Sequence, residues 1–316
     1  WLDESIHSVI KQTFSDFEFI IVDDGSRDRT PDILRKSAAA DSRIQVISKA
    51  NTGCADSLNA GIEKARGEWI ARLDADDICE PARLEKQFEL AKKSPGVVYI
   101  GTGHTAIDQD GNPLKVYRYP SQHASLLKHL LSAQKFPSHS SAFYRTQIVR
   151  SLGGYRTRIR GAEDHDLWLR LSEAGDLTCL VDPLVRVRRH PDQVSNEEAG
   201  KRQWTDSRVA TTSYWLRFSG SMDPLSDDEA HFDAFRAFIE ERLTEEDLFA
   251  NEVIQRKLIK VLYGSSNNLS AGVFKAMAVS MQHPVIVLRL IRQILIGDHL
   301  PHRLAKEWMD QSNKSL

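Results

Sequence analysis

A short apolar segment, residues 68–73, runs directly into three carboxylates, Asp74, Asp76 and Asp77. The segment predicts a buried strand, and carboxylates crowded at its end repel one another unless positive charge offsets them. Mg²⁺ and Mn²⁺ prefer oxygen ligands, and Mg²⁺ is commonly held by one or two carboxylates together with substrate phosphates. The pattern therefore favours a metal site that holds a diphosphate. For an Asp-x-Asp pair considered by itself, an acidic turn is the better explanation.

A second strand predicted over residues 17–22 also ends in carboxylates, Asp23 and Asp24. In open α/β sheets, ligands bind outside the carboxyl ends of the strands, so two acidic strand ends can converge on one crevice. The two ends together favour a binding site over a pair of acidic turns.

Strands and helices alternate through the first hundred residues. The strands are predicted over 17–22, 44–48 and 68–73, and the helices over 30–40, 56–65 and 81–93. Thr30 followed by Pro31 is typical of a helix N-cap and first helical position. This alternation predicts an α/β fold with a mostly parallel, three-layer sheet.

A glycine motif, Gly101-x-Gly103-x-x-Ala106, follows a predicted strand over 97–100 and superficially resembles a dinucleotide-binding fingerprint. That fingerprint needs a helix directly after it, whereas residues 108–113 read as a turn. We therefore predict a β-hairpin here.

The composition narrows the class of protein. The chain has 316 residues, 41% of them hydrophobic, and a net charge of −2, which argues against a nucleic-acid partner. Its cysteines, Cys54, Cys79 and Cys179, are far apart and odd in number, which suits a reducing cytoplasm and predicts three small buried residues. Apolar runs stay well short of the ~18 residues that a spanning helix needs, so a membrane-embedded synthase is not expected.

Several motifs occur in the order and spacing of the family 2 glycosyltransferases, over roughly the first two thirds of the chain. They are Val22-Asp23-Asp24-Gly25-Ser26, Leu58-Asn59-x-Gly61, Ala65-Arg66-Gly67-Glu68, Ala71-Arg72-Leu73-Asp74-Ala75-Asp76-Asp77, Pro81-x-Arg83-Leu84-x-x-Gln87, Gly153-Gly154-Tyr155, Glu163-Asp164-x-Asp166-Leu167-Trp168 and His190-Pro191-x-Gln193-Val194-Ser195. The chain resembles this family, and the resemblance implies the GT-A fold. Processive relatives carry Gln-x-x-Arg-Trp, which Lys201-Arg202-Gln203-Trp204 does not match, so a non-processive enzyme of bacterial-type polysaccharide biosynthesis is implied.

The resemblance implies an inverting transfer of a sugar from a nucleoside-diphosphate sugar, with a UDP-sugar favoured. The acceptor would be a hydroxyl of a glycan or of a lipid-linked molecule, and Mn²⁺ or Mg²⁺ would assist a single displacement. Two alternatives stay open. A metal-dependent nucleotidyltransferase would release pyrophosphate, and an inactive protein would bind nucleotide without turnover.

For the metal, Asp76 is the first choice of ligand, with Asp74 beside it to contact metal, sugar or ribose. Asp77 either supports these ligands or caps the following segment. His190 lies where relatives place a further ligand, although a solitary histidine is more often structural.

For the nucleotide, the motifs assign Asp23 and Asp24 at the first acidic strand end, together with Asp56 and Arg72. Arg72 either neutralises phosphate or forms an ion pair with a nearby aspartate. Arg186, Arg188 and Arg189 are expected to face either phosphate or water.

For the acceptor, the resemblance assigns Asp164 as the base and Glu163 as an acceptor contact or orienting partner. The structural alternative is that both acids complement the dipole of a helix that begins here and continues to Ala174. His139 is expected to line the acceptor side.

The resemblance also predicts the organisation of the chain. Residues 1–6 align with the helix that follows the family's first strand, so the first strand is expected to be missing. A catalytic GT-A domain is expected over 1–203, and a helical C-terminal region over 204–316.

The C-terminal region carries two apolar patterns. A capping box over 226–229 and apolar residues at helical spacing, from Phe232 to Ile239, predict a packed helix, and another helix is predicted over 244–262. The segment 284–296 reads as a basic amphipathic helix that either packs on the protein or contacts a membrane surface. We expect a cytoplasmic protein, with peripheral binding at the inner face of the membrane left open.

Overall fold

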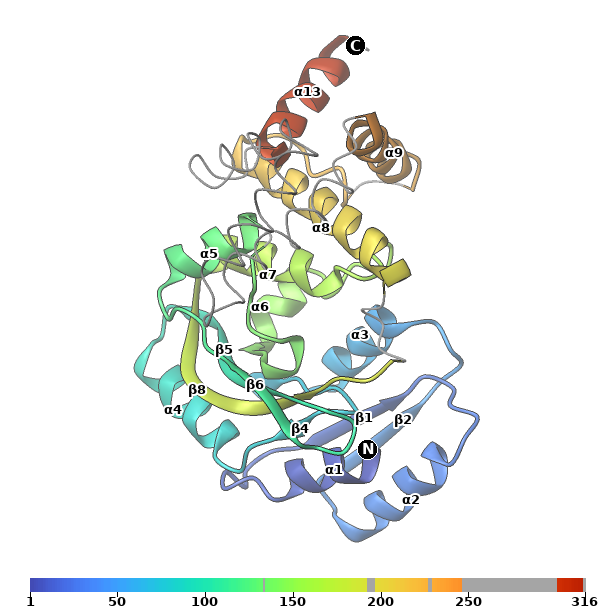
Figure 1. Cartoon of the computed structure of the whole chain (residues 1–316), viewed down its shortest axis with the longest axis vertical. Coiled ribbons are helices and arrows are strands. Elements are labelled where there is room, and N and C mark those ends of the chain that lie inside the picture. The colour runs from blue at the N-terminus through green and yellow to red at the C-terminus, as the bar shows by residue number, and fades with distance from the viewer. Residues whose placement is uncertain (133, 192–196, 227–228, 246–299, 315–316) are drawn as a thin grey trace, which may run out of the picture. The chain divides into compact units, whose positions relative to one another are not determined.

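The computed structural model describes residues 1–132, 134–191, 197–226, 229–245 and 300–314 (Figure 1). The chain divides into two compact units, Trp1–Ala199 and Gly200–Leu316.

The first unit begins with helices around a pair of parallel strands. These elements are α1 (Leu2–Ile10), β1 (Phe19–Asp23), α2 (Thr30–Ala40), β2 (Ile44–Ser48) and α3 (Cys54–Lys64). β1 pairs with β2 in parallel, with Phe19 opposite Ile44. Ile6, Leu34 and Ile44 form the buried centre of this part, so the apolar faces of α1 and α2 meet β2. The predicted βαβ pattern is confirmed here.

The remaining strands form one mixed sheet in the order β3-β7-β5-β8-β4, with β6 also paired to β5. Its strands are β3 (Trp69–Ala71), β4 (Ile78–Cys79), β5 (Val97–Ile107), β6 (Pro113–Tyr117), β7 (Phe143–Arg145) and β8 (Asp176–Arg188). The prediction of a mostly parallel sheet is wrong for this part, since β5–β8 is its parallel pair among the described residues and the other pairs are antiparallel. Strand direction depends on where each connection returns, which local sequence patterns do not reveal.

Helices cover both faces of the mixed sheet. The connecting helices are α4 (Arg83–Lys93), α5 (His123–Leu131), η1 (His139–Ser141), α6 (Thr146–Ser151) and α7 (Glu163–Ala174). Ile100 of β5 packs with Ala91 of α4 on one face. Its neighbour Tyr99 points to the other face, where its ring centroid lies 4.6 Å from that of Trp168 on α7. This gives the predicted three-layer arrangement.

Several element boundaries differ from the sequence expectation. The N-cap of α2 is Arg29 rather than Thr30, and the backbone N–H of Thr30 donates to Asp28 Oδ1. α3 starts at Cys54, directly after Gly53, whose φ of 101° suits glycine. The predicted hairpin over residues 97–117 is confirmed, with β5 continuing through both glycines of the rejected fingerprint. Cys79 and Cys179 are buried as predicted, but Cys54 is exposed at the helix start.

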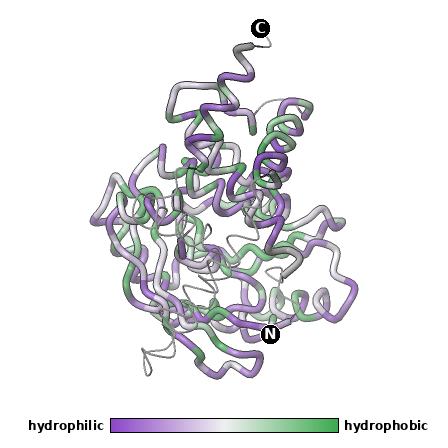
Figure 2. Tube along the Cα trace, turned by 45° about the horizontal axis from the view of Figure 1, so that its top comes forward, coloured by the Kyte–Doolittle hydropathy of each residue, from purple (hydrophilic) through white to green (hydrophobic). Residues whose placement is uncertain are grey.

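The second unit consists of helices in the part of the chain that the structure describes: α8 (Glu197–Phe218), α9 (Glu229–Glu245) and α13 (Leu300–Lys314). The predicted apolar stripe of α9 is confirmed as a packing face, because Phe235 and Phe238 lie against Trp308 with ring centroids 5.1 and 5.2 Å away. Figure 2 shows hydrophobic and hydrophilic residues alternating along these helices.

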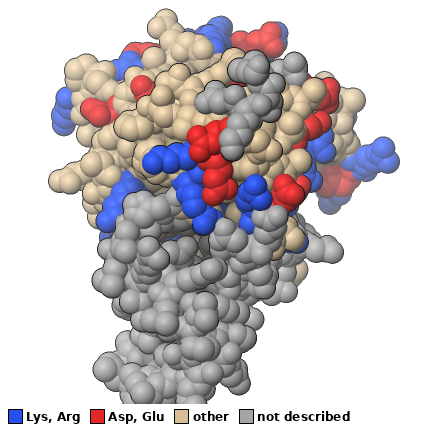
Figure 3. Space-filling view, turned by 90° about the horizontal axis from the view of Figure 1, so that it is seen from above, with Lys and Arg blue, Asp and Glu red and all other residues tan. Residues whose placement is uncertain are grey.

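Some predictions fall on residues outside the described ranges. They are the middle of the capping box at 227–228, most of the helix predicted over 244–262, the amphipathic segment 284–296 and the end of the histidine motif, 193–195. Among the described helices, none combines the length and the apolar character that crossing a bilayer requires. The surface in Figure 3 carries acidic and basic side chains close to one another near its centre.

Candidate active site

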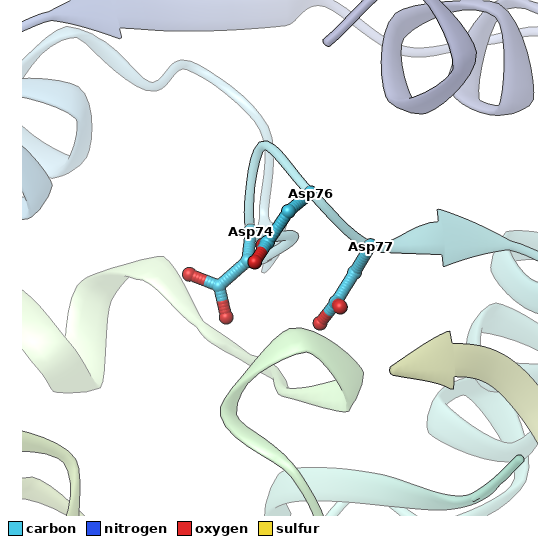
Figure 4. Close-up of side chains that lie close together, drawn as sticks. All are labelled: Asp74, Asp76 and Asp77. Atoms are coloured by element: carbon cyan, nitrogen blue, oxygen red, sulfur yellow. The ribbon is translucent and has the colours of Figure 1, made fainter. Parts of the chain in front are cut away.

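Three aspartates meet in the short loop between β3 and β4. Figure 4 shows the side chains of Asp74, Asp76 and Asp77 leaving this loop toward the same side. One carboxylate oxygen from each lies within 4.8 Å of the others, so they can share a cation. Their surroundings differ, and this difference assigns them different roles.

Asp74 forms a two-bond ion pair with Arg72. Both guanidinium Nη atoms donate to its carboxylate, and Arg72 itself is buried. Burial alone would favour the neutral acid, but the charge and hydrogen bonds of Arg72 outweigh it and lower the pKa of Asp74. Of the two expectations for Arg72, the structure shows the ion pair.

Asp77 is buried and serves as an acceptor for two other segments. The hydroxyl of Ser140 and the backbone N–H of Arg188 both donate to its carboxylate, the latter at 2.8 Å. Burial, followed by the nearby charge of Asp74, raises the pKa of Asp77. Asp77 therefore ties the loop to β8 and η1, which matches the expected supporting role.

Asp76 faces His190, with Nε2 of the imidazole 2.9 Å from Oδ2 of the carboxylate. The Asp76 side chain is 32% exposed, so a ligand can reach it, whereas Asp77 is enclosed. Nδ1 of His190 is buried without a hydrogen-bond partner among the described residues. The carboxylate oxygens of Asp74, Asp76 and Asp77 are the ligands that Mg²⁺ and Mn²⁺ prefer, so the aspartate loop fits a divalent ion, with the imidazole of His190 next to Asp76.

Arg188 is a buried arginine that holds the aspartate loop in place through hydrogen bonds. It is 1% exposed, and its guanidinium donates to the backbone carbonyls of Asp76 at 2.9 Å and Gln109 at 2.8 Å and to Oε2 of Glu4 at 2.6 Å. A buried cation with this many partners holds distant segments in fixed positions. The expectation that Arg188 faces phosphate or water is therefore wrong.

Asp164 and Glu163 begin α7, as predicted. The backbone N–H of His165 donates to Asp164 Oδ1 at 2.7 Å, and that of Gly161 donates to Glu163 Oε2, also at 2.7 Å. Burial, followed by the charge of Glu163, raises the pKa of Asp164 to about 6, and Arg72 and Asp74 lie close enough to affect it. A carboxylate held next to the aspartate loop with this pKa is suited to accept a proton near neutral pH.

The first acidic strand end forms a second cluster. Asp24 accepts hydrogen bonds from Lys49 and from the backbone N–H groups of Thr52 and Gly53, at 3.0 and 2.8 Å. These contacts outweigh burial and lower the pKa of Asp24 to about 2. Lys49 Nζ also lies 3.1 Å from the Asp56 carboxylate, so it bridges two residues expected to bind nucleotide.

Asp23 lies at the end of β1, buried, and its carboxylate accepts from the backbone N–H of Ser26 at 3.0 Å. Cys54 is the first residue of the helix that carries Asp56, and burial, together with the charges of Glu163, Asp74 and Asp164, raises its pKa. The start of α3 therefore lies near the aspartate loop and the start of α7.

Other predicted residues have different outcomes. His139 Nε2 lies 2.8 Å from the hydroxyl of Tyr155, inside an aromatic cluster with Trp168. Arg186 forms an ion pair with Glu80 at 2.6 Å. Arg189 is exposed.

Sequence reasoning missed Ser140 and Lys49. Ser140 donates to Asp74 and Asp77, more than sixty residues before it, and Lys49 bridges Asp24 and Asp56. A single serine or lysine carries no local pattern that would mark it. Arg188 was named, but its burial among backbone carbonyls could not be foreseen from an arginine-rich strand end.

The model of the glycosyl transferase family 2 matches residues 1–153. The chain is similar to the putative glycosyltransferase EpsE of Bacillus subtilis, with 38% identity over 197 residues, which is 60% of this chain and 69% of EpsE. It is also 29% identical over 221 residues to the amylovoran biosynthesis glycosyltransferase AmsE of Erwinia amylovora, covering 69% and 80% of the two chains.

Among solved structures, S. aureus TarS 1–349 in complex with UDP-GlcNAc resembles this one with a TM-score of 0.57 and 18% identity. The match covers 78% of this chain and 69% of that one. This likeness concerns the fold, which agrees with the GT-A architecture expected from the motifs.

Proposed function

Because the chain belongs to glycosyl transferase family 2 and is a glycosyltransferase of the polysaccharide-building type, we propose that it transfers a sugar from a nucleoside-diphosphate sugar to an acceptor hydroxyl with inversion. We favour a UDP-sugar as donor, since TarS, which shares the fold, was solved with UDP-GlcNAc. The acceptor would be a glycan or a lipid-linked molecule. The catalytic domain would end near residue 203, with 204–316 as the helical region.

The observation that carries this proposal is the position of Asp164. Its carboxylate lies at the start of α7 with a pKa of about 6, near enough to Asp74 and Arg72 to be affected by both. The proposed site would thus combine a base with a group of carboxylates that suits a metal–diphosphate. An inverting transfer needs these two elements on opposite sides of the sugar.

In the proposed mechanism, Asp23, Asp24 and Asp56 hold the nucleoside, with Lys49 keeping the last two in place. Asp76, with Asp74 and His190, would hold Mn²⁺ or Mg²⁺, and the bound ion would stabilise charge on the departing diphosphate. Arg72 fixes the orientation of Asp74.

Asp164 takes the proton of the acceptor hydroxyl as the oxygen attacks the anomeric carbon, and one bond forms while the bond to the diphosphate breaks. Glu163 accepts a hydrogen bond from the backbone N–H of Gly161 and so orients the loop before α7. The configuration at the anomeric carbon is inverted because the displacement is single.

The test of this proposal is a donor screen. UDP-, GDP- and dTDP-sugars are incubated with the protein and Mn²⁺ or Mg²⁺, and released nucleoside diphosphate and pyrophosphate are measured separately. Release of nucleoside diphosphate supports sugar transfer, pyrophosphate would indicate nucleotidyl transfer, and binding without release would indicate an inactive nucleotide-binding protein.

Asp76→Ala is expected to abolish most of the gain in UDP affinity that Mn²⁺ provides, a loss on the order of tenfold or more. The reason is that Asp76 is the exposed carboxylate that faces His190. Calorimetric titration of UDP with and without Mn²⁺ measures this. Asp16→Ala, which removes an exposed aspartate before β1, is the control. If the wild type and Asp76→Ala bind UDP equally well, both with and without Mn²⁺, Asp76 is not a metal ligand.

The kcat/KM of transfer is expected to rise with pH and level off above about pH 6, because Asp164 accepts a proton only when ionised. Below this value the rate should fall about tenfold per pH unit.

The free energy of unfolding changes with pH in the opposite direction. The folded state holds the Asp164 proton more tightly than the unfolded chain does, so this contribution to stability is lost as pH rises through about 6. Measuring rates and urea midpoints over the same pH range checks both; a rate that does not change below pH 6 contradicts the assignment.

A further inference from the structure

Tyr117, at the end of β6, is surrounded by aromatic and cationic side chains. The His104 ring stacks on it with centroids 4.7 Å apart. Lys135 Nζ lies 4.5 Å from the centroid of the Tyr117 ring, and Lys115 Nζ lies 5.4 Å from it. A cation–π contact attracts an ammonium group to a ring without using its hydrogen-bond donors, so both lysines can still bind an anion.

Arg189 adds a third positive charge next to this ring cluster. It follows directly after β8, and its backbone N–H donates to the carbonyl of Ile107, the last residue of β5, at 2.9 Å. After burial, its charge is the next cause of the lowered pKa of His104. We call Lys115, Lys135 and Arg189 the cationic patch.

All three members of the cationic patch are exposed, and none forms an ion pair with a carboxylate in the part of the chain that the structure describes. Arg186, three residues before Arg189, shows the contrast because it is paired with Glu80 at 2.6 Å. Three neighbouring cations repel one another, and an anion among them would relieve that repulsion.

His104 supplies an independent observation. It is 4% exposed, its Nδ1 lies 3.3 Å from the hydroxyl of Tyr119, and its Nε2 has no hydrogen-bond partner among the described residues. Burial, then Arg189 and Lys135, lowers the pKa of His104 to about 4, so the ring stays neutral. Buried ring nitrogens are normally satisfied by protein, water or ligand, and an unpaired one within a patch of cations points to a ligand site.

The cationic patch lies beside the acceptor side of the site. Phe136 follows Lys135 directly, and its ring centroid lies 6.4 Å from that of Trp168 on α7. Asp164 lies one helical turn before Trp168, so Lys135 is near the helix that carries the proposed base. The donor diphosphate belongs to the aspartate loop, so an anion at the cationic patch would come from the other substrate.

We propose that Lys115, Lys135 and Arg189, arranged around Tyr117 and His104, bind an anionic group of the acceptor, either a phosphate or a carboxylate. This inference rests on the proposed function, because it names the chemistry of the acceptor. A soluble acidic glycan and the headgroup of a lipid-linked acceptor share this chemistry. The experiment separates the two sources.

Binding is measured by calorimetry or sedimentation with the full chain, without any transfer reaction. The soluble probes are tetragalacturonate as a carboxylate, glucose 6-phosphate as a phosphate and maltotetraose as a neutral control. The membrane probe is phosphatidylcholine vesicles with and without phosphatidylglycerol. Variants Lys115→Gln and Arg189→Gln are compared with the matched control Arg186→Gln.

Each patch variant is expected to weaken binding of an anionic probe about threefold to fivefold, and the double variant about tenfold or more. Arg186→Gln should bind the anionic probe as well as the wild type does, and UDP affinity should be unchanged in the patch variants. Added salt should weaken binding of the anionic probe. Preference for the soluble anions identifies an acidic glycan, and preference for the anionic vesicles identifies a lipid headgroup.

The proposal is overturned if the wild type binds none of the anionic probes, if maltotetraose binds as well as they do, or if Arg186→Gln has the same effect as Arg189→Gln. Loss of the proposed function would appear differently, as a chain that binds the anionic probe at the cationic patch but releases no nucleoside diphosphate from any donor.

Discussion

Asp164→Asn is expected to lower kcat for sugar transfer by ~10²–10⁴, the usual effect of removing a positioned general base. The amide keeps the shape of the side chain and its place at the start of α7, but it cannot take the proton of the acceptor hydroxyl. Affinity for the donor should stay close to that of the wild type, because the nucleotide contacts lie on other elements. Steady-state kinetics together with a UDP titration separate the two effects.

Asp32→Asn on α2 is the control, since Asp32 is an exposed helical aspartate paired with Arg35 on the surface. Near-normal turnover of Asp164→Asn in an enzyme proven active would remove Asp164 from the base role. Loss of the folded state would instead show that its main contribution is structural. A circular dichroism melt of the variant distinguishes this case from a catalytic defect.

Asp166→Ala is expected to reduce the free energy of unfolding by about 3–5 kcal/mol, the range for breaking one side of a buried ion pair. Asp166 is completely buried and accepts from Arg156 at 3.0 Å and from Arg170 at 2.9 and 2.6 Å. Arg170 is buried as well and also donates to the carbonyls of Leu152 and Gly154, both at 2.8 Å. Removing the carboxylate takes away the negative charge of Asp166 from a buried guanidinium.

Urea unfolding measures the loss, and Asp32→Ala is the matched control because it breaks an exposed pair that contributes at most ~1 kcal/mol. A change for Asp166→Ala no larger than that of the control would mean that Arg170 is adequately compensated by the two carbonyls. Asp166→Asn, which keeps the volume, should fall between the two.

Periodicity in the sequence was sufficient for α2, α3, α4 and α7 and for the first two strands, whereas α5 and α6 were not predicted. α7 and β2 have the predicted bounds, and the apolar residues of α9 form the predicted packing face. A local pattern shows which residues are apolar along one segment. It does not show which strands pair, so the antiparallel pairs of the mixed sheet and the parallel pairing of β5 with β8 could not be predicted.

The candidate site shows the same division. The motifs named its carboxylates, because acids at strand ends are a local feature. They could not decide whether Arg72 faces phosphate or Asp74, since that depends on which oxygen lies within reach in the folded chain. Ser140, which donates to Asp77 from 63 residues away, has no local signature at all.

Arg188 joins segments that are far apart along the chain: Asp76 lies 112 residues before it, Gln109 lies 79 residues before it, and Glu4 lies 184 residues before it. Contacts of such separation form only after long loops have closed, which slows folding. The aspartate loop should therefore acquire its final geometry late, after the β1–β2 unit has formed from contacts closer in sequence. In native-state hydrogen exchange, the amide of Arg188 bonded to Asp77 should open only with the cooperative unfolding of the whole catalytic unit, so that its exchange rate reports the integrity of the site.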